Sequence, residues 1–225
     1  MKLSAFRNNL QRLIYNATPI ALLADNAATT PLTNIQTALH TAYPGLAGDQ
    51  TTSEVAYTGY ARVATTRNTG GWTVTTNSVS PVAAITFGQM TAGVGGTVTH
   101  ATTGFAASGA SQAIDCFVLG SRLGPFSAVV AGNAITIPGL AGLAVNDRIV
   151  FHLVDGSTLP TGITEGQSYF VITVSTDVIT VSVTQGGASI TLSSAGDGLA
   201  FRSTPIAITN GVTPQLTTGM AAVLE

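Results

Sequence analysis

Charge is scarce in this 225-residue chain: only 8% of its residues are Asp, Glu, Lys or Arg, and Lys2 is the single lysine. Ordinary soluble domains carry roughly 25% charged residues. A nucleic-acid-binding surface needs clustered Lys and Arg to neutralise phosphates, so eight basic residues with a net charge of −2 argue against that class. Exposed positions must instead carry Thr, Ser, Asn, Gln, Gly or Ala, which favours β-structure covered by partner molecules.

Cysteine and long apolar runs are also scarce. Cys116 is alone, so no intrachain disulfide and no cysteine-based zinc site can form. The mean hydropathy is +0.40, yet no run approaches the roughly 18 to 20 apolar residues of a membrane-spanning helix. The apolar run at residues 13–15 is broken by Asn16 and Pro19, so no signal peptide is predicted. The expected protein has no membrane partner.

Two short helices are predicted near the start of the chain. Ser4 can cap the first, over residues 4–15, and the second, over residues 31–41, has Pro31 in its first turn. A helix as short as the first needs a surface to dock on, either its own domain or a neighbouring subunit. The apolar residues that we expect to form this interface are Phe6, Leu10, Leu13 and Ile14.

After Tyr43, turn signals recur every 8 to 12 residues and separate short β-rich runs. Such punctuation is typical of an all-β sandwich or barrel. In the first part of the chain, strands are expected over residues 55–63, 72–75, 83–87, 96–100 and 113–119. In the second part, they are expected over residues 134–137, 147–153, 168–174, 178–184, 188–192 and 199–202. Asn210-Gly211 is the strongest hairpin dipeptide.

Three phrases of sequence point to one family. They are LHTAYPGLAGDQTTSE at residues 39–54, YTGYARV at 57–63 with WTV at 72–74, and ITF at 85–87 followed by GTVTH at 96–100. In this order and spacing they resemble small tailed-bacteriophage virion structural proteins, of tail-fibre-like or decoration type. The resemblance covers roughly residues 35–120 and implies a component of the virion.

In that family a closing segment similar to residues 206–216 follows the Thr-His strand closely, whereas here residues 127–202 intervene. This stretch resembles a β module found inside phage fibre and head proteins, which implies an insertion. Insertion into an exposed hairpin is tolerated because loop-closure entropy grows slowly with length.

The predicted fold is therefore all-β: a β-sandwich or jelly-roll-like domain with a short N-terminal helical segment and an inserted small β-barrel or sandwich domain. The predicted parts are a helical docking segment (1–42), a first β domain (43–126), an inserted β domain (127–202) and C-terminal strands that complete the first domain (203–225).

No residue pattern indicates chemistry. His40, His100 and His152 lack the spacing of metal ligands. The ten carboxylates are scattered, and four of them, Asp147, Asp155, Asp177 and Asp197, are expected mostly at turns. We therefore expect no enzyme, no catalytic or metal site and no cofactor. Exposed aromatic residues would instead favour glycan binding, and Tyr169 and Phe170 are the residues of the insert that test it.

The resemblance and composition together predict a non-enzymatic virion structural protein that self-associates as a trimer or larger and docks onto other virion proteins of the capsid, neck or tail. Head or collar decoration is the favoured position, because the chain is short and has no long fibrous repeat. A tail-fibre or tail-tip component and a host-surface glycan-binding module are the alternatives.

Overall fold

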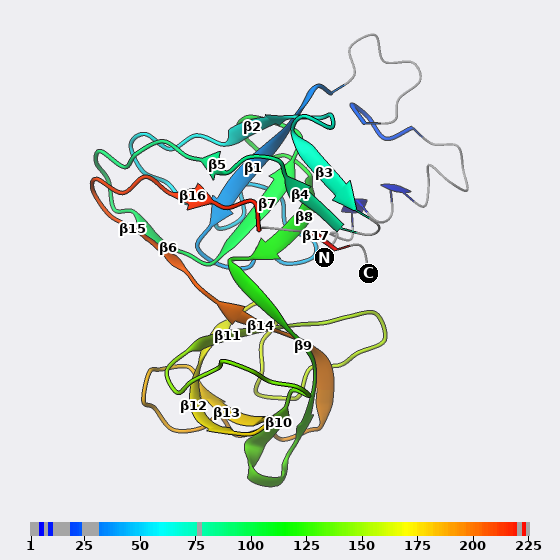
Figure 1. Ribbon diagram of the computed structural model, residues 1–225, viewed down its shortest axis with the longest axis vertical. Coiled ribbons are helices and arrows are strands. Elements are labelled where there is room, and N and C mark those ends of the chain that lie inside the picture. Colours follow the sequence, from blue (N-terminus) through cyan, green and yellow to red (C-terminus); the bar gives the residue numbers. More distant parts are fainter. Residues whose placement is uncertain are drawn as a thin grey trace. The chain divides into compact units, whose positions relative to one another are not determined.

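The structure is a computed structural model that describes residues 5–6, 9–10, 19–23, 32–75, 78–219 and 222–223. Its described elements are almost all β-strands, which confirms the all-β prediction (Figure 1). The chain divides into two compact units. Unit 1 comprises Met1–Phe117 and Ile206–Glu225, and unit 2 comprises Val118–Pro205. The helix predicted over residues 4–15 lies mostly outside the described residues and stays a prediction.

Unit 1 is built on an antiparallel four-stranded sheet with the order β2-β1-β7-β8, and three smaller sheets surround it. The strands of the main sheet are β1 (Asn34–His40), β2 (Val63–Thr66), β7 (His100–Gly104) and β8 (Ala113–Val118). The smaller sheets pair β3 (Trp72–Thr75) with β4 (Ser78–Pro81) and β17 (Ala222–Val223), β5 (Ile85–Thr86) with β16 (Gln215–Leu216), and β6 (Gly96–Val98) with β15 (Ile206–Ile208).

The second predicted helix, over residues 31–41, is wrong: Asn34–His40 form strand β1. β1 lies between β2 and β7, and its side chains from Ile35 to His40 are buried on both faces of the sheet. A strand buried on both faces does not show the alternation of apolar and polar residues that marks a half-buried strand. Its apolar residues could therefore be read at helical spacing.

Two predicted strands are also absent. In the stretch 55–63 only Val63 enters a strand, because the backbone turns at Tyr57–Tyr60, where the Tyr60 N–H donates to the Tyr57 carbonyl at 3.1 Å. Residues 188–192 form no strand, although the Ile190 N–H donates to the carbonyl of Val181 at 2.8 Å. In both stretches apolar and polar side chains alternate, but the backbone does not pair as a strand. Strand pairing depends on a neighbouring strand that the local sequence does not specify.

Unit 2 is a closed six-stranded barrel with the order β10-β13-β12-β11-β14-β9. Thr176, with a positive φ of 53°, lies in the predicted hairpin turn between β12 and β13. The elements are β9 (Gly120–Val129), η1 (Ala131–Asn133), β10 (Ala134–Thr136), β11 (Arg148–His152), β12 (Ser168–Ser175), β13 (Val178–Ser182) and β14 (Gly196–Ser203).

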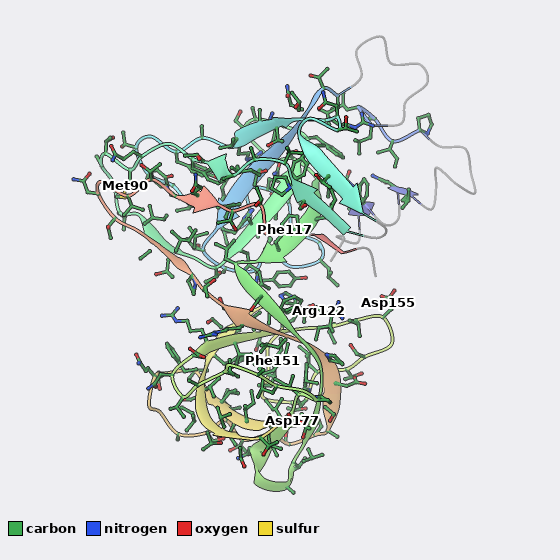
Figure 2. The ribbon with its side chains drawn as sticks, viewed as in Figure 1. Met90, Phe117, Arg122, Phe151, Asp155 and Asp177 are labelled. Atoms are coloured by element: carbon green, nitrogen blue, oxygen red, sulfur yellow. The ribbon has the colours of Figure 1, made fainter. Side chains whose placement is uncertain are left out.

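The barrel encloses one apolar core, and Figure 2 shows Phe151 within it. Phe126 meets Phe151 edge-on at a centroid distance of 4.8 Å, and Tyr169 lies 6.0 Å from Phe151. The Tyr169 hydroxyl accepts the Thr164 N–H at 2.7 Å, so the buried phenol keeps a polar partner. Closure of the sheet leaves this barrel without an unpaired edge strand.

Candidate functional site

The most concentrated group of polar side chains in the described part of unit 1 is centred on Arg62 and Glu54. Arg62 is only 7% exposed. Its Nε and Nη2 donate to the two carboxylate oxygens of Glu54 at 2.8 and 2.7 Å, which is the bidentate geometry of a strong charged pair. The hydrogen bonds that Arg62 donates to Glu54 raise the pKa of Arg62, so the guanidinium stays charged.

Every N–H of the Arg62 guanidinium has an acceptor. Besides Glu54, Nη1 donates to the Gln50 side chain at 3.4 Å and to the Ala106 carbonyl at 2.9 Å, and Nη2 donates to the Gly109 carbonyl at 2.9 Å. One side chain therefore holds the loop before it and the loop after β7. With its donors used, Arg62 offers no free N–H to a substrate, and its role in this arrangement is to fix the two loops.

Tyr60 and His40 extend the same group toward β1. The Tyr60 hydroxyl donates to Glu54 at 2.9 Å and accepts the Leu39 N–H at 3.0 Å. Burial raises the pKa of Tyr60, which keeps the phenol protonated as a donor. Burial also lowers the pKa of His40, whose two ring nitrogens lie 2.8 Å from the Thr52 carbonyl and the Thr102 hydroxyl.

The residues of this group lie in the first two resembling phrases, at residues 39–54 and 57–63. In the sequence, Glu54 is one of ten scattered carboxylates, and no local pattern distinguishes Arg62. The pair could have been found from the position of Glu54 and Arg62 in two neighbouring resembling phrases, because charged residues are rare in this chain. The resembling phrases thus encode the internal framework of unit 1 rather than an exposed reactive site.

One of the three histidines, His40, is placed differently from the sequence expectation. His40 lies at the end of a strand, not of a helix, and pairs directly across the sheet with His100. Both are fully buried. His152 is in unit 2, where Nδ1 lies 3.5 Å from a carboxylate oxygen of Glu165. Among the described residues, no group of three or more His, Cys, Asp or Glu side chains is placed to hold a metal ion.

A second feature of unit 1 is an apolar pocket between the main sheet and the β3–β4 hairpin. Its volume is about 380 Å³. Arg67 at its rim is held by the turn before β1, because its guanidinium donates to the carbonyls of Leu23 at 2.9 Å and Leu32 at 3.2 Å. The lining residues are Ile35, Arg67, Asn68, Thr69, Trp72, Val79, Thr103, Ile114, Asp115 and Phe117.

Two of the four residues predicted to form an interface are described. Phe6 is 9% exposed and packs with Ile20, Ile35 and Ile114 of its own unit, and Leu10 is half-buried against the same cluster. Leu13 and Ile14 lie outside the described residues. The interface made by these four residues stays a prediction.

Several aromatic side chains that could stack on a sugar pack against other residues of the chain. Tyr169 is buried in the barrel core, and the guanidinium carbon of Arg148 lies 4.8 Å from the ring centroid of Phe170. Tyr60 stacks on Phe87 at a centroid distance of 6.1 Å. Trp72 packs half-buried against the cluster around Phe6. Within the described part of the chain, no helix is long and apolar enough to cross a membrane.

Comparison with known families places the similarity in unit 1. A family model described as Podophage GP4 fiber I protein gp80 matches residues 14–114, which is somewhat less than half of the chain. No curated protein matches. The matched residues include all three resembling phrases and the Arg62–Glu54 pair. The match confirms the resemblance to tailed-phage virion structural proteins and identifies the chain as a structural component of a bacteriophage virion.

Proposed function

We propose that the protein is a component of the phage fibre apparatus that acts by self-association and docking rather than by catalysis. The observation that carries this proposal is the position of the family match. Residues 14–114 lie wholly within unit 1, and unit 2 begins at Val118. Unit 1 is then the assembly part, which this chain shares with a fibre protein family, and unit 2 is an addition carried on it.

The chain enters and leaves unit 2 at neighbouring positions, which supports the view that unit 2 is an insertion available to partners. The first and last strands of the barrel, β9 and β14, pair from Gly120↔Ser203 onward, and the Thr204 N–H donates to the Leu119 carbonyl at 2.7 Å. The two ends of unit 2 therefore lie side by side, so the barrel interrupts unit 1 at one point. Such an insertion can contact a partner without rearranging the unit that carries it.

The low charge of the chain supports assembly through dry contacts between copies. Only 8% of the residues are charged, so few charges lose their hydration when two surfaces meet. We propose a homo-oligomer, a trimer or larger, that also contacts other virion proteins. Light scattering at several concentrations measures this: a stable trimer or larger species supports the proposal, and a monomer at every concentration contradicts it.

Head or collar decoration is the second candidate. It is favoured by the compactness of both units and by the lack of a fibrous repeat in the described residues. The name of the matched family, a fibre protein, favours a role in the fibre instead. The glycan-binding alternative is weakened by the burial of Tyr169 and by the packing of Phe170 under Arg148, and we do not propose it.

Labelling of intact virions separates the first two candidates. A short epitope inserted between Gln185 and Gly186 lies in an exposed turn of unit 2, where added residues disturb little structure. The tagged phage is decorated with gold-labelled antibody and viewed by electron microscopy, with untagged virions as the control. Gold on the tail fibres supports the fibre role. Gold confined to the head or collar contradicts it and supports decoration.

A further inference from the structure

The connection between β15 and β16 contains Asn210-Gly211, a dipeptide with a chemistry of its own. Asn210 is the only asparagine of the chain that is followed by glycine, and both residues are exposed in the turn (Figure 1). Asparagine is a chemically labile residue. A following glycine makes it more so, because a residue without Cβ leaves the asparagine side chain open to attack by the next backbone nitrogen.

The turn itself is well defined. The Val212 N–H donates to the Thr209 carbonyl at 3.0 Å, which closes a β-turn over residues 209–212. Gly211 occupies the third position with a φ of +87°, a conformation that glycine adopts without strain. Asn210 therefore precedes a glycine whose place in the turn is fixed by the fold.

The backbone of Gly211 is held by an earlier segment of unit 1. Its N–H donates to the Met90 carbonyl at 2.8 Å, and the Met90 N–H donates to the Val212 carbonyl at 2.9 Å. The Gln89 side chain donates to the Gly211 carbonyl at 2.9 Å. Met90, labelled in Figure 2, is only 3% exposed, so this anchor belongs to the folded interior of unit 1.

The reaction open to this dipeptide is loss of the side-chain amide. The Gly211 nitrogen gives its proton to solvent and bonds to the Asn210 side-chain carbonyl carbon, and the amide leaves as ammonia, which closes a five-membered succinimide ring. Water then opens the ring at either of its two carbonyls. One opening gives aspartate, and the other gives isoaspartate, in which the backbone runs through the side chain. The net change consumes one water and releases one ammonia.

The hydrogen bond from Gly211 to Met90 opposes the first step. The attacking atom is the nitrogen whose N–H is engaged with the Met90 carbonyl, so this bond must break before the proton leaves and the nitrogen approaches the side chain. The reaction therefore requires a local opening of the turn, and its rate falls in proportion to the population of the open state.

We propose that Asn210 is a site of spontaneous deamidation, and that the contacts of Gly211 with Met90 and Gln89 set its rate by keeping the turn closed. This modification is independent of the proposed assembly role. Each conversion adds one negative charge to a chain with a net charge of −2. The isoaspartate product also lengthens the backbone between β15 and β16 by one carbon, which disrupts the hydrogen bonds to residues 89 and 90.

Peptide mass spectrometry of the full-length chain after timed incubation at mildly alkaline pH measures the conversion. The mass change from amide to acid is followed on the peptide that contains Asn210, and isoaspartate is identified by its separate elution. The chain unfolded in urea should convert at least about tenfold faster than the folded chain, because unfolding removes the closed turn. Asn210→Gln should abolish the conversion at this position, because its longer side chain does not form the five-membered ring.

Two glutamine variants test the control by the turn. Gln89→Ala removes the hydrogen bond to the Gly211 carbonyl and should speed the conversion about two- to tenfold, the effect of one hydrogen bond on the opening equilibrium. Gln215→Ala is the matched control. It removes an equally exposed amide that donates to the Thr86 hydroxyl at 2.8 Å, away from Gly211, and should convert like the wild type.

Hydrogen exchange of the segment that contains Gly211, measured on the same samples, shows whether each variant keeps its fold and how far the turn opens. An unfolded chain that keeps its amide contradicts the modification site itself. A folded chain that converts as fast as the unfolded one contradicts the control by Met90 and Gln89, and so does a Gln89→Ala variant that converts no faster than Gln215→Ala.

Discussion

The two units reach a folded state by different means. Unit 2 is one closed barrel around an apolar core, in which Phe151 and Ile149 are fully buried. Unit 1 divides its strands among four sheets and buries polar side chains, among them Arg62 and His40. A closed barrel needs only apolar residues of suitable volume. Several small sheets need specific hydrogen bonds to hold their loops, and a buried charge is stable only while its partners are in place.

The comparison shows that the family resemblance lies in the hydrogen-bonded part of unit 1. The resembling phrases supply the charged pair and its neighbours, because a hydrogen-bonded network tolerates few substitutions of its members. The barrel core tolerates exchange among apolar residues of similar size. Four experiments on the full-length chain test this contrast.

The largest effect is expected from a cavity in the barrel. Phe151→Ala removes a fully buried aromatic ring and should lower the stability of unit 2 by about 3 to 5 kcal/mol. Hydrogen exchange read by mass spectrometry should show faster exchange across β9 to β14 and little change in β1 and β7. Phe151→Leu is the control with a smaller loss. Faster exchange spread equally over both units would show that the units do not unfold independently.

Breaking the charged pair should have a comparable or slightly smaller effect on unit 1. Arg62→Ala removes the arginine donors of the Glu54 carboxylate, which keeps only the Tyr60 hydroxyl bond, and of two loop carbonyls, which should cost about 3 kcal/mol. The residues after β7 should lose exchange protection first, while unit 2 keeps it. Arg62→Lys should restore only part of the loss, because an ammonium cannot bind a carboxylate in bidentate fashion. Full rescue by lysine would contradict the proposed geometry.

A smaller effect is expected from acid acting on unit 1 through His40. Burial lowers the pKa of His40, so the folded state favours the neutral ring and the unfolded state binds the proton more readily. The stabilisation is present above the ordinary pKa near 6.5 and is lost as pH falls below it, with a slope no steeper than about 1.4 kcal/mol per pH unit for one proton.

Denaturant unfolding between pH 8 and pH 5 measures this dependence. The variant His40→Gln has no titrating ring and should show a flatter profile over that interval. The difference between the two profiles isolates His40 from the carboxylates and the other histidines. Parallel profiles would show that His40 does not carry the acid sensitivity.

The smallest effect is expected from the charged pair on the barrel surface. Arg202 donates to Asp147 at 3.1 Å, but its side chain is 40% exposed. Exposed pairs contribute about 0 to 1 kcal/mol, so Arg202→Ala should shift thermal unfolding little. Compared with Arg62→Ala, this variant tests whether burial and the number of hydrogen bonds decide the worth of an arginine in this chain. A loss as large as that of Arg62→Ala would refute that view.

The local sequence predicted those parts of the fold that local chemistry decides. The hairpin around Thr176 and Asp177 and the strand at Trp72–Thr75 appear where they were expected. Asn210-Gly211 does form a turn, with φ at +87° for Gly211. The flanking strands β15 and β16, however, pair with β6 and β5 instead of with each other. Turn-forming residues determine where the chain reverses direction, but they do not determine which strands pair with the strands on either side of the turn.

The candidate site could be predicted only in part, for the same reason. Glu54 and Arg62 are visible in the sequence as members of resembling phrases, but their bidentate pairing depends on a backbone that turns between them. The contacts of Arg62 with Ala106 and Gly109 join segments more than forty residues apart. The cross-strand neighbours His40 and His100 are even farther apart in the chain.

Scarce charge, frequent glycine turns and the resembling phrases are properties of residues along the chain, so an all-β virion protein could be predicted from them without a structure. The folded chain was needed to show that residues 34–40 form a central strand and that Arg62 is buried and holds two loops. The physical reason is that burial and pairing are set by contacts between segments far apart in sequence, which local preference does not encode.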